Sequence, residues 1–88
     1  MLTFTTIKEV KDNLGLWCKG LRKSEKLTQK QLAEELALSP LTISKLENGE
    51  NPTIETLLKI LQYFNEMDAF NQYVKQRMER VNNNESLY

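Results

Sequence analysis

The sequence predicts an all-α fold of five helices, and two observations carry that prediction. Apolar residues recur at the three- and four-residue spacing of an amphipathic helix over most of the chain. Serine, threonine and asparagine residues mark where most of these periodic stretches begin and end. A chain of 88 residues accommodates one small domain. We therefore expect a single domain over residues 1–81, with a disordered tail over residues 82–88.

The first helix is expected to begin after Thr6 and to end near residue 25. Thr6 and Glu9 have the spacing of a capping box. The apolar stripe that follows predicts the buried face, with Trp17 in the core; it consists of Ile7, Val10, Leu14, Trp17 and Leu21. Gly15 and Gly20 each weaken a helix by about 1 kcal/mol relative to alanine, so a break near them is an alternative.

Residues 28–49 predict two short helices joined by a tight turn. Thr28 and Gln31 have the spacing of a second capping box, and the inward face of the helix that they open is Leu32, Ala33 and Leu36. The turn falls at Ala37 and Leu38. Two short helices held at an angle by such a turn are a common device for entering the major groove of DNA.

The second helix of this pair is bounded by strong local signals. Ser39 caps it, and Pro40 occupies its first turn, where a missing N–H costs nothing. Ile43 and Leu46 point inward. The pair Asn48-Gly49 ends the helix, because glycine adopts the left-handed conformation readily.

Two further helices complete the predicted fold. Thr53 precedes a helix that we expect to end near Asn65, with Ile54, Leu57, Leu58 and Leu61 on its apolar face. Asp68 is expected to cap the last helix, at about residues 68–81. Its stripe is Phe70, Tyr73, Val74, Arg77, Met78 and Val81. Large aromatic residues exceed what so small a core holds, so we expect a dimer interface formed by Phe64, Phe70, Tyr73 and Val74.

Composition excludes several classes of site. The chain has no histidine and one cysteine, so common zinc sites and histidine-based catalysis are absent, and no metal or cofactor is expected. Cys18 is expected to be an inert packed thiol rather than a redox sensor. No nucleophile–base pair or phosphate loop indicates an enzyme. The formal net charge is zero, so any DNA binding must come from a local basic face.

Residues 22–61 resemble the helix-turn-helix domain of the Cro and phage-repressor family, whose members are often called Xre-type regulators. The residues that carry the resemblance are Arg22, Gln29, Leu32, Ala33, Leu36, Ser39, Ile43, Ser44, Leu46, Glu47, Asn48 and Gly49, with the run ETLLKIL at residues 55–61. The resemblance implies a five-helix DNA-binding domain of the phage-repressor type.

The resemblance also implies roles for particular residues. Gln29 and Asn48 match phosphate-contacting positions, and Pro40, Leu41, Ser44 and Lys45 match base-reading positions. The full set of expected DNA contacts is Thr28, Gln29, Lys30, Ser39, Pro40, Leu41, Thr42, Ser44, Lys45 and Asn48. Arg22 and Glu47 match an ion pair that ties the first helix to the recognition helix.

Three residues depart from the pattern of the family. Ala37 stands where glycine is frequent, and alanine tolerates a left-handed turn poorly. Pro40 and Leu41 replace polar base readers, although Leu41 is able to touch a thymine methyl group. We therefore expect Lys45 to be the main direct reader, with a contribution from DNA shape.

The sequence thus predicts a dimeric, sequence-specific DNA-binding repressor that recognises an inverted repeat in double-stranded DNA. The alternative is an antitoxin that neutralises a protein toxin and regulates its own operon, and the two roles are compatible. The chain starts without the pattern of a secretory signal, and no apolar run reaches the roughly 20 residues that span a bilayer. We therefore expect a cytoplasmic protein without a membrane partner.

Overall fold

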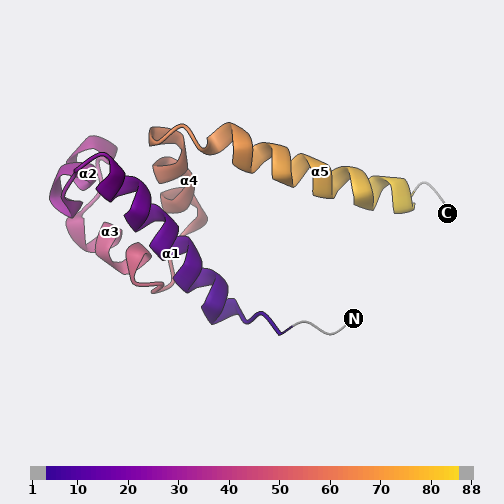
Figure 1. Ribbon diagram of the computed structural model, residues 1–88, viewed down its shortest axis with the longest axis horizontal. Helices are drawn as coiled ribbons and strands as arrows, with labels where there is room; N and C mark the ends of the chain where they lie inside the picture. The colour runs from indigo at the N-terminus through magenta and orange to yellow at the C-terminus, as the bar shows by residue number, and fades with distance from the viewer. Residues whose placement is uncertain (1–3, 86–88) are drawn as a thin grey trace.

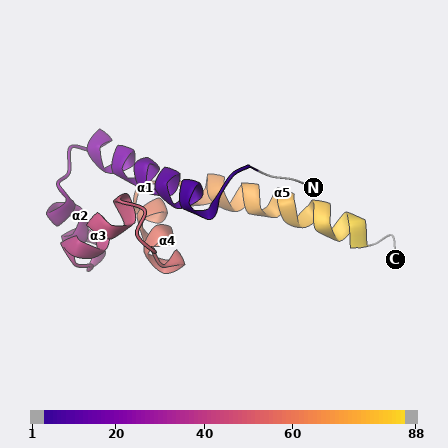
Figure 2. The same cartoon turned by 90° about the horizontal axis from the view of Figure 1, so that it is seen from below.

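The computed structural model describes residues 4–85 and confirms an all-α fold. Its five helices are α1 (Ile7–Ser24), α2 (Gln29–Leu36), α3 (Pro40–Glu47), α4 (Ile54–Tyr63) and α5 (Met67–Glu85). Helices α1 to α4 form a compact body, and α5 leaves this body as a long arm (Figures 1 and 2). The arm accounts for the elongated shape of the molecule, which measures 51 × 27 × 20 Å.

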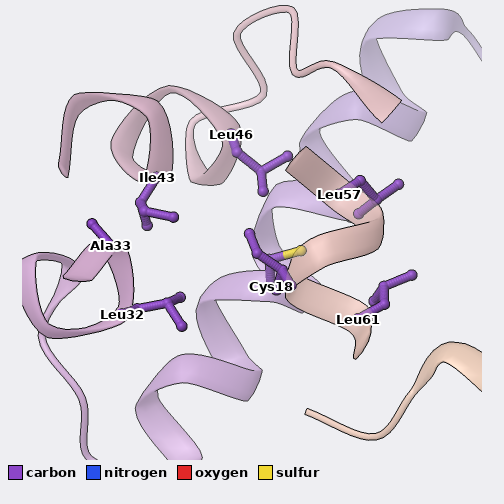
Figure 3. Close-up of a cluster of buried hydrophobic side chains, with 8 residues drawn as sticks. Cys18, Leu32, Ala33, Ile43, Leu46, Leu57 and Leu61 are labelled. Atoms are coloured by element: carbon purple, nitrogen blue, oxygen red, sulfur yellow. The ribbon is translucent and has the colours of Figure 1, made fainter. Parts of the chain in front are cut away.

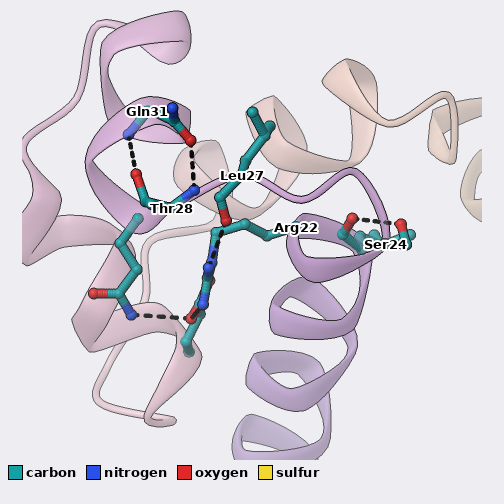
Figure 4. A network of polar contacts seen from close by, with 8 residues as sticks. Arg22, Ser24, Leu27, Thr28 and Gln31 are labelled. Carbon is teal, nitrogen blue, oxygen red and sulfur yellow. Dashed lines mark hydrogen bonds and ion pairs between the residues drawn. The ribbon is translucent and has the colours of Figure 1, made fainter.

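Hydroxyl side chains fix the start of the first four helices. The side-chain oxygens of Thr6, Thr28, Ser39 and Thr53 each accept from a backbone N–H three residues later, at 3.0–3.1 Å. At Thr28 the expected capping box is complete, because the Gln31 side chain accepts from the Thr28 N–H at 2.8 Å (Figure 4). The starts of α2 and α3, which carry the expected DNA contacts, are therefore set locally by the sequence.

The expected cap of α5 at Asp68 is wrong by two residues. Phe70 N donates to Glu66 O at 3.1 Å, so the first helical bond already forms ahead of Asp68. The turn between α4 and α5 is complete at Glu66, because Asn65 takes a positive φ of 61° and Glu66 N donates to Leu61 O. Asp68 lies in the first turn, where its charge favours the helix dipole.

The core lies where the four body helices meet. Its fully or almost fully buried members are Cys18, Leu32, Ala33, Ile43, Leu46, Leu57, Ile60 and Leu61 (Figure 3). The inward faces expected for α2 and α3 are confirmed, with Leu36 partly buried at the edge. Ala33 is completely buried beneath α3, so its small side chain allows the two helices of the motif to approach each other.

The expected buried face of α1 is wrong. Gly15, Cys18 and Arg22 are its buried residues, whereas Trp17 is 36% exposed. Two small residues and the arginine of the ion pair therefore form the buried face, and the stripe of large apolar residues lies beside that face. Ile7 and Val10 are exposed, and Leu14 and Leu21 pack against the edge of the core. Helix α1 runs unbroken through Gly15 and Gly20, so the alternative of a break there is also excluded.

Two further expectations need correction. Ile54, expected on the buried face of α4, is 72% exposed, because it is the first residue of the helix and lies outside the packed turns. Helix α5 continues to Glu85, beyond the expected end at residue 81. Its asparagine-rich end lacks apolar periodicity, but neither glycine nor proline follows Met67 to stop a helix. Residues 86–88 of the expected tail lie outside the described residues.

Cys18 is fully buried between the helices of the body. Burial and, to a smaller extent, the negative charge of Glu47 raise the pKa of the Cys18 thiol to about 11. The thiol is therefore protonated at neutral pH and out of reach of solvent, which supports an inert packing role.

The turn between α2 and α3 contains backbone strain at Ala37, which takes φ 55° and ψ 42°. We expect Ala37→Gly to raise the free energy of unfolding by about 1 kcal/mol, because glycine removes the clash of a Cβ atom in this conformation. Thermal unfolding measures the effect. Ala69→Gly in exposed α5 is the control and should lower stability. Equal losses in both variants would contradict the strain.

Candidate nucleic-acid interface

One face of α3 is open to solvent and carries three of the expected DNA contacts. Leu41, Lys45 and Asn48 follow each other at intervals of four and three residues, so they lie on one side of the helix. The opposite side is buried through Ile43 and Leu46. Leu41 is 61% exposed although it is apolar, which makes it available for contact with a base or a methyl group.

The N-terminal end of α3 is built on two hydroxyl groups. Ser39 Oγ accepts from Thr42 N at 3.1 Å and shares a 2.8 Å hydrogen bond with Thr42 Oγ1. These contacts give both residues a structural role in starting the helix. Pro40 is exposed at the first helical position, and Ser44 is half-buried beside the open face. Direct DNA contacts by these residues stay predictions.

The N-terminus of α2 lies beside the C-terminal end of α3. Gln29, the first residue of α2, is half-buried, and its Nε2 donates to Glu47 Oε1 at 3.0 Å. Asn48 follows Glu47 directly, so the two expected phosphate contacts come from neighbouring helix ends. Thr28 and Lys30, on either side of Gln29, are exposed. The structure thus brings the polar residues at the N-terminus of α2 close to those at the C-terminal end of α3.

The ion pair that the resemblance implied is present and buried. Arg22 Nε donates to Glu47 Oε2 at 2.7 Å, and Arg22 Nη2 donates to Glu47 Oε1 at 2.9 Å. The third bond of the guanidinium runs from Nη1 to Leu27 O at 2.8 Å (Figure 4). The side chains of Arg22 and Glu47 are 9% and 2% exposed. Arg22 therefore holds α1, the loop before α2 and the end of α3 in one arrangement.

Both members of the pair are charged at neutral pH. The hydrogen bond to Glu47 raises the pKa of Arg22, against the opposing effect of burial. Burial raises the pKa of Glu47, but hydrogen bonds from Arg22 and Gln29 together with nearby positive charge outweigh it, so the net pKa is lowered. The pair is thus a fully ionised, bidentate contact.

Two lysines near the motif were not singled out from the sequence. The charge of Lys19 contributes to the lowered pKa of Glu47, which places it near the end of α3. Its position three residues before Arg22 was the available signal, because residues so spaced share a helix face. Lys11 Nζ donates to Asn51 Oδ1 at 2.7 Å and holds the loop that follows α3. Lys19 therefore adds positive charge near the buried ion pair, and Lys11 supports the loop after α3.

The residues expected in a dimer interface fall into two groups. Phe64 and Phe70 pack against the edge of the core, whereas Tyr73 and Val74 on α5 are 61% and 38% exposed. The exposed face of α5 has a shallow groove, lined by Val74, Arg77, Met78, Val81 and Asn82. Of the four expected interface residues, the two exposed ones therefore lie on the arm, and the other two contribute to the core.

Within residues 4–85, no group of three acidic or cysteine side chains is placed to hold a metal ion. None of the helices in this part of the chain is long and apolar enough to cross a membrane.

Comparison with known proteins identifies the family. The family model described as helix-turn-helix matches residues 19–68, which is more than half of the chain and covers the motif and α4. A comparison with curated proteins gave no match. The matched region contains the open face of α3, the capped start of α2 and the buried ion pair. The chain belongs to the Cro and phage-repressor (Xre-type) helix-turn-helix family and is a DNA-binding transcription regulator.

Proposed function

We propose that the protein is a repressor that binds an inverted-repeat operator as a homodimer. The observation that carries the proposal is the open face of α3, where Leu41, Lys45 and Asn48 project from a helix whose other side is anchored in the core. A recognition helix held in this way is able to enter the major groove as a rigid element. The protein, when bound to its operator, would block transcription from an overlapping promoter.

Lys45 and Gln29 have different roles in this proposal. Lys45 is exposed in the last turn of α3. Its ammonium group would donate hydrogen bonds to the O6 and N7 atoms of a guanine. Gln29 opens α2, where backbone N–H groups and the helix dipole favour a phosphate. Leu41 contributes apolar contact with a thymine methyl group. Lys45 therefore carries sequence information, whereas Gln29 carries affinity.

The first test is selection of bound sequences from random DNA, followed by affinity measurements on single-base variants of the selected site. Lys45→Ala should cost about 1–3 kcal/mol on the best sequence and relax the preference at one base pair per half-site. Gln29→Ala is the comparison and should weaken all sequences by a similar factor. A Lys45→Ala variant that weakens every sequence equally would make this lysine a phosphate contact and move base reading to Leu41, Ser44 or DNA shape.

The dimer is proposed to form through α5. Two recognition helices must lie about 34 Å apart to read successive major grooves on one side of DNA. The arm offers Val74, Met78 and Val81 on one exposed face, together with Tyr73 beside it. Burying these side chains against a second copy removes apolar surface from water and links two motifs.

Sedimentation at micromolar concentration tests the interface. We expect a dimer for the wild-type protein and a monomer for Val74→Glu with Met78→Glu. The control, Gln72→Glu with Gln76→Glu, adds the same charge to residues on the other side of the same helix and should stay dimeric. A dimer that survives the first pair of substitutions would contradict the proposed interface.

An antitoxin is the second candidate function. The favouring observation is that the exposed apolar face of α5 would also suit a partner protein, and the net charge of zero is low for a protein that only binds DNA. Co-expression with the product of the neighbouring gene is the test. Copurification of the two proteins, and growth of cells that the neighbouring gene product alone inhibits, would support this role. The Val74→Glu, Met78→Glu variant should fail to restore growth.

A further inference from the structure

Glu47 receives hydrogen bonds from two other helices through one buried carboxylate. Its Oε2 accepts from Arg22 Nε at 2.7 Å. Its Oε1 accepts from Arg22 Nη2 at 2.9 Å and from Gln29 Nε2 at 3.0 Å. Arg22 lies in the last turn of α1, Gln29 is the first residue of α2 and Glu47 is the last residue of α3. One side chain thus joins three helix ends.

We propose that Glu47 is a positioning residue that sets the direction of the Gln29 amide for a DNA phosphate. This inference rests on the proposed function, in which Gln29 contacts phosphate. A carboxylate accepts hydrogen bonds and donates none, so only the NH₂ group of Gln29 can face Glu47. With one N–H held there, the amide no longer rotates freely, and its second N–H is left for another acceptor. A rotated amide would instead be able to turn its oxygen toward the phosphate and repel it.

The surroundings of Gln29 favour the same ligand. The complete capping box at Thr28 fixes the start of α2, and the Gln31 N–H is already bonded to Thr28 Oγ1 at 3.0 Å. The earlier backbone N–H groups of the first turn, at Gln29 and Lys30, have no acceptor within the helix, which is the usual geometry for binding an anion. The side-chain N–H of Gln29 would therefore act beside backbone donors, at a helix end with positive character.

This role differs from that of the Arg22–Glu47 ion pair. The ion pair fixes α1 against α3 and would do so without Gln29. The bond from Gln29 leaves the charge of the pair unchanged, but it orders a half-buried side chain before DNA arrives. An ordered amide gives up less rotamer freedom on binding, so its contact with phosphate contributes more to affinity.

A double-mutant cycle tests the proposal, with a DNA duplex of mixed sequence as the probe at low salt. Gln29→Ala should weaken binding about three- to tenfold, as expected for the loss of one hydrogen bond. Glu47→Met, which nearly keeps the size of the side chain but has no oxygen to accept from Gln29, should weaken binding by a similar factor. Gln29→Ala should then cause little further loss in the Glu47→Met protein, because the positioned amide is already lost.

Two controls separate positioning from folding. Glu47→Asp retains the charge opposite Arg22 but withdraws the carboxylate from Gln29, and it should also abolish the effect of Gln29→Ala. Lys30→Ala removes a neighbouring side chain that is exposed and lies outside the network, so its effect on affinity should be equal in all backgrounds. The NMR signals of the Gln29 side-chain amide report on its hydrogen bond to Glu47. One amide proton should be shifted downfield in the wild type, and both should have the chemical shifts of a free amide in the Glu47 variants. All measurements are made below the unfolding transition of the weakest variant.

The outcomes are distinct. An undiminished effect of Gln29→Ala in both Glu47 variants overturns the positioning role. Equal DNA affinity of the wild-type and Gln29→Ala proteins also overturns it; this outcome removes the phosphate contact of Gln29 from the proposed function and leaves the repressor role itself standing. Wild-type protein that binds neither mixed-sequence nor selected DNA contradicts the proposed function itself, and the inference fails with it.

Discussion

Replacing Arg22 with methionine should lower the free energy of unfolding by about 3–5 kcal/mol. The substitution removes the positive partner of Glu47 and leaves a carboxylate that is 2% exposed without its charge compensation. It also deprives Leu27 O of a hydrogen bond at 2.8 Å. Denaturant unfolding monitored by circular dichroism measures the loss. Lys23→Met is the matched control, because Lys23 is exposed on the same helix and should change stability by less than about 0.5 kcal/mol.

The effect of Arg22→Met should depend on pH in a specific direction. In the wild type, the lowered pKa of Glu47 stabilises the fold fully above about pH 4.3, and this contribution is lost as the pH falls through the lowered folded-state pKa. In the variant, the Arg22 side chain that lowers the pKa of Glu47 is gone, and burial favours the neutral form of Glu47. Acidification therefore removes the unpaired charge by protonating this carboxylate. The stability difference between the two proteins should therefore shrink on acidification. A difference that stays constant from pH 7 to about pH 3 would contradict a charged buried pair.

Replacing Gly15 with alanine should lower stability by about 2 kcal/mol, even though alanine is the better helix former. A Cβ atom at Gly15 would lie 2.6 Å from both Leu46 O and Glu47 O. These atoms belong to the backbone, so α1 and the end of α3 must move apart. Overpacking of this severity costs about 3 kcal/mol, and the gain in helix propensity returns up to about 1 kcal/mol. Thermal and denaturant unfolding measure the net loss.

Gly20→Ala provides the control for this prediction. Gly20 is also inside α1, but nothing lies within 4 Å of the position of its Cβ atom. Alanine should therefore stabilise the protein by up to about 1 kcal/mol, through helix propensity alone. The two alanine variants should differ by about 3 kcal/mol. Equal effects would place the close approach of α1 and α3 elsewhere. DNA affinity should fall in Gly15→Ala alone, since the displaced end of α3 carries Asn48.

The sequence was most informative where local chemistry decides the structure. The starts of α1 to α4 follow from hydroxyl caps that bond to nearby N–H groups, and the left-handed turn at Ala37 follows from the tightness of the connection. The inward residues of α2 and α3 were predicted correctly because large apolar side chains mark them. The Arg22–Glu47 pair came from the resemblance to the family rather than from spacing along the chain.

The sequence was least informative where packing between distant segments decides. The contact face of α1 is formed by Gly15 and Cys18, which a search for large apolar residues passes over. Trp17 is half-exposed as a result. The bond between Gln29 and Glu47 joins residues 18 positions apart, and no periodicity predicts it. The end of α5 was placed too early because periodicity stops before the helix does.

The arm formed by α5 has a thermodynamic consequence for the proposed dimer. Most of this 19-residue helix has no partner in the body, and a lone helix gains little stability in water from propensity alone. Its order would then be completed by the second copy, so that folding of the arm and association form one linked equilibrium. Part of the binding energy would be used to order the arm, which weakens the dimer and makes it sensitive to protein concentration. Repression would consequently rise steeply with the cellular level of the protein and relax quickly when that level falls.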